Sequence, residues 1–146
     1  MTKEEYKSKI RQWLKDDAEY NKLIEGEEVS DNDIELCLEL AKDEWNSIGR
    51  QTNYNVEGIP QTGIFTLLTI AHVLEMCGTR QERNRLSYSD GGVNVNPDDK
   101  LQSFMAVATS IRNRITPLIE KYKLRLTFGF GINTNPFDIS EEIKEL

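Results

Sequence analysis

The sequence predicts a mainly α-helical bundle of four to five helices, with a projecting loop and an extended, β-like C-terminal tail. Four stretches repeat apolar residues at helical spacing, and three of them begin with a residue type that caps helices. After residue 122 the apolar period changes from helical to two. A chain of 146 residues is long enough for one domain with a modest core.

The first two helices are predicted from their start signals. Thr2 followed by Glu5 forms a capping box, so a helix should begin at the N-terminus and run to about Lys15. Ser30 and the carboxylates after it open a second helix, which Gly49 should end. The apolar faces of the two helices hold Tyr6, Ile10, Trp13 and Leu14 in the first, and Ile34, Cys37, Leu38, Ala41, Trp45 and Ile48 in the second.

A third helix follows a loop at residues 50–60, whose Asn, Gly and Pro content favours turns. The helix should begin near Thr62 and run to about Arg83. Its apolar residues occupy more than one side, which is typical of a central, buried helix, and Gly78 lies within it or ends its buried part. They are Ile64, Leu67, Leu68, Ala71, Leu74 and Met76.

A fourth helix should begin at Asn96, with Pro97 in its first turn and two aspartates at its positive end. Pro117 lies inside this pattern, so we expect a kink, or a split after about Ile115. The apolar face is predicted to hold Leu101, Phe104, Met105, Ala108, Ile111, Ile115, Leu118, Ile119 and Tyr122.

The tail is predicted to contain a strand. Apolar residues alternate with Arg125, Thr127 and Gly129, and they are Leu124, Leu126, Phe128 and Phe130. A lone strand needs a partner for its backbone groups, either at Val93–Val95 or on another chain. We therefore divide the chain into a helical bundle at 1–122 and an extended C-terminal docking segment at 123–146.

The loop at 86–96 is the most distinctive stretch of the sequence. Three arginines precede a Tyr-Ser-Asp-Gly-Gly turn and a short alternating Val-Asn-Val segment. A helical hairpin needs only a few residues to reverse, so this long polar connection should project towards a partner. The residues that we assign to protein interaction in this region are Arg80, Arg83, Arg85, Tyr88, Asp90, Val93 and Val95.

Charge is spread unevenly along the chain. The net charge is −7, and residues 1–60 carry all of it, with 8 basic and 15 acidic residues. Residues 80–125 carry +4. An acidic face repels nucleic acid, unless it lines a passage through which DNA must slide without binding.

The sequence gives no sign of membrane insertion or export. No apolar run approaches the roughly 20 residues of a membrane span, and the N-terminus lacks the apolar core of a signal peptide. We therefore expect synthesis and retention in a cytoplasm. Cys37 and Cys77 both lie among apolar neighbours, so we expect two separate, buried thiols rather than a disulfide or a metal pair.

Catalytic, cofactor and metal sites are not predicted. His72 is the only histidine, and Glu75 at i+3 is the one partner that would make it a general base. One histidine and two distant cysteines do not make a zinc site. The adjacent aspartates at 16–17 and 98–99 are expected to cap helices, because neighbouring helical residues point in different directions.

The arginines could serve two purposes. Arg80, Arg83 and Arg85, with Arg112 and Arg114, could bind the phosphates of a nucleic acid. No aromatic ladder accompanies them and the overall charge is unfavourable. We expect them to pair with acidic residues instead, either within the chain or across an interface.

The order of these features resembles the small neck proteins of tailed bacteriophages, the head-to-tail connector or adaptor family. The resemblance lies in an acidic helical N-terminal half, a long helix ending in the arginines and the Tyr88–Gly92 turn, a second long helix and an extended apolar tail. It implies a homo-oligomeric ring, commonly twelve-fold, that joins the portal protein to other neck or tail proteins and lets DNA pass unbound. It places the protein in the virion, after assembly in the host cytoplasm.

In this family a C-terminal segment docks on the portal, and residues 123–146 match it by position and pattern. The docking residues would be Leu124, Leu126, Phe128, Phe130, Ile132, Phe137 and Ile139. The N-terminal helix and Pro117 depart from the simple family pattern. These departures leave open the position in the neck, either adaptor or stopper or tail-completion protein. Three other classes also stay open: a small cellular protein-interaction module, an enzyme that uses His72 and Glu75, and a nucleic-acid binder that uses Arg80, Arg83 and Arg85.

Overall fold

The computed structural model describes residues 1–16, 19, 27–87 and 100–128. These residues form four α-helices and one short 3₁₀ helix, and no strand occurs among them. The prediction of a mainly α-helical chain is confirmed. The elements are α1 (Lys3–Leu14), α2 (Asp31–Ser47), η1 (Val56–Gly58), α3 (Thr62–Ser87) and α4 (Lys100–Phe128).

The predicted capping box at Thr2 and the predicted cap at Ser30 both form. The Thr2 hydroxyl accepts a hydrogen bond from the Glu5 backbone N–H at 3.3 Å, and the Glu5 carboxylate accepts one from the Thr2 N–H at 2.8 Å. Ser30 and Asp33 make the same reciprocal pair at the start of α2. Gly49, with φ +62°, follows the C-cap of α2 in the left-handed region, where glycine carries no steric penalty. The predicted starts of these two helices are therefore correct, whereas the predicted start of the fourth helix at Asn96 lies outside the described residues.

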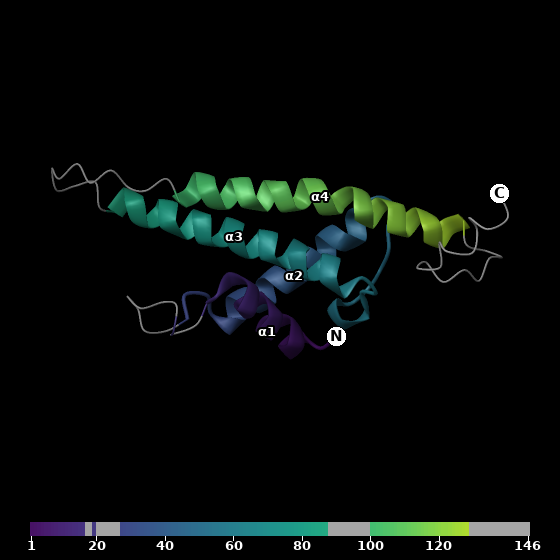
Figure 1. Cartoon of the computed structure of the whole chain (residues 1–146), viewed down its shortest axis with the longest axis horizontal. Helices are drawn as coiled ribbons and strands as arrows, with labels where there is room; N and C mark the ends of the chain where they lie inside the picture. Colours follow the sequence, from purple (N-terminus) through teal and green to yellow (C-terminus); the bar gives the residue numbers. More distant parts are fainter. Residues whose placement is uncertain (17–18, 20–26, 88–99, 129–146) are drawn as a thin grey trace, which may run out of the picture.

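The long helix α3 lies at the centre of the fold (Figure 1). Helix α4 runs antiparallel along one side of it, whereas α1 and α2 lie on the other side. The last turn of α2 reaches the second half of α4, where Lys123 meets it. This arrangement explains why α3 is apolar on more than one side, as the sequence predicted.

An aromatic cluster holds α1, α2 and α3 together. The Phe65 ring meets the Tyr6 ring edge-on, with centroids 5.2 Å apart, and the Trp45 ring at 6.3 Å. All three side chains are completely buried. The core also contains Cys37 and Cys77 as free, buried thiols, which confirms that expectation.

Three residues expected in the core are exposed instead. Trp13 is 48% exposed, because it lies in the last turn of α1, beyond the part of the helix buried through Tyr6 and Ile10. Met105 and Leu118 are 40% and 47% exposed. They lie on the two edges of the buried stripe of α4, and none of the described helices covers the outer side of α4.

The predicted strand is wrong over its described part. Helix α4 continues to Phe128, so Leu124, Leu126 and Phe128 are helical, whereas Phe130 lies outside the described residues. A helix satisfies its own backbone hydrogen bonds, while a strand would need a partner. The Lys123 ammonium also anchors this part of α4, because it donates hydrogen bonds to the carbonyls of Trp45 and Ile48, the latter at 2.8 Å.

Pro117 does not split the fourth helix. Figure 1 shows α4 as one continuous helix whose axis turns slightly in its second half. Proline removes the hydrogen bond to the carbonyl of Asn113, and both residues are exposed, so water can satisfy that carbonyl. The predicted split after Ile115 is therefore wrong.

By length and composition, the Thr62–Gln81 part of α3 could cross a membrane, contrary to the expectation that no stretch approaches this length. Half of that stretch is buried inside the protein, and the core helix of a soluble protein meets the same criteria. We therefore interpret α3 as the core helix of the bundle.

Candidate functional site

The arginines that precede the predicted projecting loop lie in or near the last turns of α3. Arg80 forms an ion pair with Asp33 of α2, with Nη2 and Oδ2 2.7 Å apart. This is the intramolecular pairing that the sequence allowed, and it occupies Arg80. Arg83 and Arg85 lie in the same helix. Four further predicted residues, Tyr88, Asp90, Val93 and Val95, lie outside the described residues.

The predicted docking segment is described only at its beginning. Leu124 and Leu126 are 54% and 48% exposed, although they belong to a helix rather than a strand. Phe128 ends that helix. Phe130, Ile132, Phe137 and Ile139 lie outside the described residues. The two leucines are therefore exposed, on a helical surface rather than on a strand.

Helix α4 exposes two further apolar side chains, of which the sequence interpretation placed only Leu118 on the apolar face. Val107 is 41% exposed and Leu118 is 47% exposed. They share one side of the helix with three exposed cations at helical spacing. We call this set the outer stripe of α4: Val107, Arg114, Leu118, Lys121 and Arg125.

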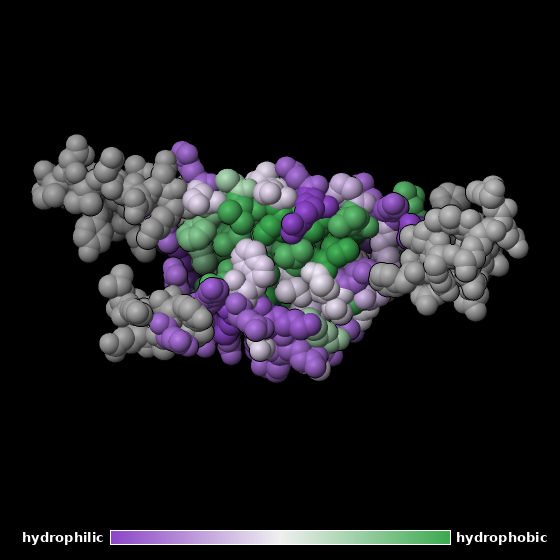
Figure 2. All heavy atoms as spheres, viewed as in Figure 1, coloured by the Kyte–Doolittle hydropathy of each residue, from purple (hydrophilic) through white to green (hydrophobic). Residues whose placement is uncertain are grey.

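The surface of the protein has an apolar part and a hydrophilic part. Figure 2 shows apolar surface gathered over α4 and α3, whereas the part formed by α1 and the start of α2 is mainly hydrophilic. Exposed large apolar side chains cluster on α4, which carries five of the eight in the described residues. Large contiguous apolar patches are typical of interaction sites, and two of these five side chains, Val107 and Leu118, belong to the outer stripe of α4.

His72 belongs to a charged cluster that joins three helices. Its Nε2 lies 2.7 Å from an Oε2 of Glu44 on α2, and its Nδ1 lies 3.9 Å from Oε2 of Glu75. Arg112 of α4 binds Glu44 through two nitrogens, at 3.0 Å and 3.2 Å, and also pairs with Glu75. One guanidinium therefore bridges two carboxylates, and we interpret the cluster as a tie between α2, α3 and α4.

The chemistry available to this cluster is limited by its own contacts. A His–Glu pair can act as a general base when a substrate reaches the imidazole. Here the side chain of His72 is only 15% exposed, and Glu44 and Arg112 occupy its polar surroundings. Within the described ranges no group of three or more His, Cys, Asp or Glu side chains is placed to hold a metal ion.

The cluster predicts how stability responds to acid. Burial raises the pKa of Glu44, but hydrogen bonds from His72 and Arg112 outweigh it and lower the pKa from 4.5 to about 2. A depressed carboxyl pKa stabilises the fold above pH 4.5, and this contribution is lost as the pH falls towards 2. We expect a loss of at most about 3 kcal/mol over that range, measured by denaturant unfolding at a series of pH values.

Two substitutions separate this effect from general acid unfolding. Glu44→Gln should flatten the decline between pH 4.5 and 2, because no carboxyl remains to be protonated at this position. Glu120→Gln removes an exposed carboxylate from α4 and should leave the decline unchanged. If the free energy of unfolding falls as steeply with pH in Glu44→Gln as in the wild type, the cluster does not govern the acid response.

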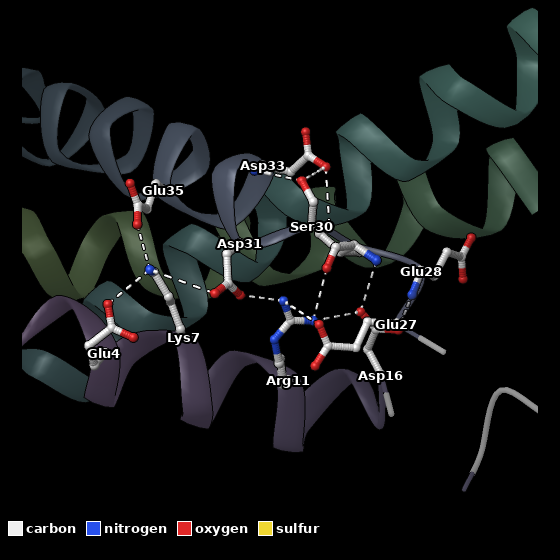
Figure 3. Close-up of polar contacts among 11 residues, drawn as sticks. Glu4, Lys7, Arg11, Asp16, Glu27, Glu28, Ser30, Asp31, Asp33 and Glu35 are labelled. Carbon is white, nitrogen blue, oxygen red and sulfur yellow. Dashed lines mark hydrogen bonds and ion pairs between the residues drawn. The ribbon is translucent and has the colours of Figure 1, made fainter. Parts of the chain in front are cut away.

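A second charged network joins α1 to α2 at the acidic end of the chain (Figure 3). Arg11 pairs with three carboxylates, those of Asp16 at 3.2 Å, Glu27 at 3.0 Å and Asp31 at 2.5 Å. Lys7 pairs with Glu35 at 2.5 Å and with Glu4 at 2.9 Å. The hydrogen bonds that the Lys7 ammonium donates to Glu35 and Glu4 raise its pKa above the ordinary value. The network holds the two helices together with a surplus of negative charge.

Asp16 makes contacts that the sequence did not suggest, whereas the turn that it was expected to cap lies outside the described residues except at residue 19. Its carboxylate accepts backbone N–H bonds from Glu28 at 2.7 Å and from Val29 at 3.0 Å, just before α2 begins. It is buried beside Arg11, which also donates to the Val29 carbonyl at 2.9 Å. Asp16 and Arg11 therefore fix the entry to α2. Asp17, Asp98 and Asp99 lie outside the described residues.

The sequence interpretation missed one exposed feature of α2. Leu36 and Leu40 are 56% and 45% exposed, and they lie one turn apart on the same side of the helix. The signal was present in the sequence, since these leucines fall outside the stripe of Ile34, Leu38 and Ala41. Acidic residues surround them, whereas cations accompany the exposed apolar residues of α4.

Comparison with known proteins adds no relative. No protein-family model, curated protein or solved structure matches this chain.

Proposed function

We propose that this chain is a non-enzymatic structural protein of a tailed-phage neck. In this role it forms an oligomeric ring that joins the portal to the tail and lets DNA pass. The observation that carries the proposal is the outward-facing surface of α4, which combines apolar and basic side chains and leads directly into residues 129–146. A helix that exposes such a surface is suited to binding other protein chains.

Two further observations favour assembly over catalysis or tight nucleic-acid binding. The one histidine is enclosed by Glu44, Glu75 and Arg112, so its contacts serve the packing of three helices. The net charge of −7 suits a ring through which DNA slides without being held. A stopper or tail-completion protein would use the same surfaces at another level of the neck.

The docking role of the C-terminal residues is tested by truncation after Phe128. The cut belongs there rather than at residue 123, because Lys123 bonds the end of α2, and Arg50 donates to the Thr127 hydroxyl at 2.9 Å. The chain of residues 1–128 should keep its helical circular dichroism and its melting temperature. We expect it to lose binding to portal rings, measured by cryo-electron microscopy or sedimentation of the mixture.

A second variant, the full-length protein with Phe130→Asp and Phe137→Asp, separates the loss of anchors from the loss of chain length. It keeps the length of the chain and changes two proposed anchors. It should also fail to dock. Docking by the truncated chain would contradict the assignment of residues 129–146. A full-length protein that forms a stable dimer and ignores every portal would contradict the neck role and favour a cellular interaction module.

A further inference from the structure

Helices α2 and α4 carry opposite charges of equal size. Helix α2 has six acidic residues and one basic residue, a net charge of −5, whereas α4 has six basic residues and one acidic residue, a net charge of +5. Each helix also exposes large apolar side chains on its solvent side. Two surfaces of one protein that are both partly apolar and opposite in charge are complementary to each other.

The cations of the outer stripe of α4 are not used within the described part of the chain. Arg112 and Lys123, which face inward, are bound by Glu44 and by the end of α2. In contrast, Arg114, Lys121 and Arg125 have neither an ion pair nor a side-chain hydrogen bond to any described residue. The stripe therefore offers three free cations beside Val107 and Leu118, and no carboxylate lies in it.

The acidic surface of α2 offers the matching features. Leu36 and Leu40 stand out from it, and Asp43, the next residue on that side, has a 72% exposed side chain. We call these three residues the outer face of α2. A hollow of about 650 Å³ adjoins this face, and its lining includes Glu39, Asp43 and Glu57. The lysines of the hollow, Lys3 and Lys42, are both paired with Glu39, and Lys42 also lies 3.2 Å from Asp43. With Glu57 the lining keeps a surplus of one negative charge.

Association of the outer stripe of α4 with itself is unfavourable. Such a symmetric contact would bring six cations of two copies together without a carboxylate between them. The outer face of α2 would meet a similar repulsion between carboxylates. Contact between the two different surfaces places opposite charges and exposed leucines together, so it is the arrangement that the charges favour.

We propose that the outer stripe of α4 in one copy binds the outer face of α2 in the next copy. The contact is head-to-tail, because a bound pair still has one free surface of each kind, and repetition closes into a ring if the rotation allows. This inference deepens the proposed function, since it names the two surfaces that would meet between neighbours in the ring. It requires no portal and no residue of the 129–146 segment.

The test uses two variants that each block one surface of the full-length chain. Leu118→Asp places a carboxylate in the outer stripe of α4, and Leu40→Lys places a cation in the outer face of α2. Both positions are about half exposed, so both variants should fold. Alone, each variant should lose the higher oligomers of the wild type, measured by sedimentation over a range of protein and salt concentrations.

Mixing the two variants distinguishes head-to-tail contact from symmetric contact. The Leu118→Asp chain keeps its outer face of α2, and the Leu40→Lys chain keeps its outer stripe of α4. The mixture should therefore form a one-to-one heterodimer that cannot extend, and this dimer should weaken as salt is added. Met105→Asp changes a residue of similar exposure on the opposite edge of the buried stripe of α4 and should assemble like the wild type.

A cross-linking measurement detects the contact even when it is short-lived. Leu36→Cys chains mixed with Leu118→Cys chains should form a disulfide under oxidation, whereas Leu118→Cys chains alone should not. The native thiols do not interfere, because burial raises the pKa of Cys37 to about 12 and that of Cys77 to about 11.

Several results would overturn the head-to-tail assignment. They are a wild type that stays monomeric without any mixed cross-link, a Leu118→Asp variant that still assembles, and a mixture of blocked variants that stays apart. DNA binding through the outer stripe of α4, lost in Arg114→Glu and steeply dependent on salt, would assign that surface to nucleic acid instead. Because no portal is present, the result is independent of the portal-docking test.

Discussion

Truncation of Phe65 to alanine is expected to lower the free energy of unfolding by about 3–5 kcal/mol. The Phe65 ring is completely buried and makes edge-to-face contacts with Tyr6 of α1 and Trp45 of α2. Its removal leaves a cavity where three helices meet, and the fixed helix caps on either side restrict how far the helices can close it. Urea unfolding followed by tryptophan fluorescence measures the change.

Two further variants show whether ring packing is the cause. Phe65→Leu keeps most of the volume and should cost clearly less than Phe65→Ala. Tyr6→Phe removes a buried hydroxyl that has no hydrogen-bond partner among the described residues, so stability should stay equal or rise. A Phe65→Ala protein that is as stable as the wild type would show that these helices are held together in another way.

Replacing Arg112 with methionine is expected to cost about 2–4 kcal/mol, which is somewhat less than the loss from a fully buried pair. Arg112 bridges Glu44 and Glu75, and its side chain is 22% exposed. Without the guanidinium the two carboxylates lie close together beside His72, in a partly dry environment between three helices. Methionine preserves the apolar stem, so the measured change in unfolding free energy reports the lost charge.

Arg114→Met is the matched control for this experiment. It removes the same side chain two residues further along the helix, where the arginine is exposed and has no partner within the described ranges. Its effect on unfolding should stay within about 0.5 kcal/mol, provided that the protein is dilute enough for assembly not to contribute. Equal losses for the two variants would contradict the role of Arg112 as an internal tie.

Local signals in the sequence were sufficient for most helix starts and ends. The Thr2–Glu5 and Ser30–Asp33 capping boxes form, and Gly49 has the left-handed conformation expected at a helix end. These predictions succeed because a cap needs only residues three or four positions apart. The position of α3 at the centre was also predictable, since only a helix with neighbours on several sides is apolar all round.

The C-terminal end of α4 could not be predicted from period alone. The alternation of Leu124 and Leu126 with polar residues is a strand signal, yet these residues are helical. The deciding contact is Lys123, which reaches across to the last carbonyls of α2, about 75 residues earlier in the chain. The residues around Lys123 do not indicate the end of α2 as its partner, and the end of α2 does not indicate Lys123. This contact is therefore set by the packing of α2 against α4.

The candidate site was likewise predictable where it depends on local sequence and unpredictable where it depends on helix packing. The sequence by itself determined the helical class, the caps, the buried thiols, the acidic N-terminal part and the basic stretch at 80–125, because these depend on composition and on neighbours a few positions apart. Only the tertiary structure decided which arginines are occupied and which are free. Arg80 and Arg112 meet carboxylates of α2 when the helices pack, whereas Arg114 faces outward, and spacing along one helix cannot show which of its sides another helix will cover.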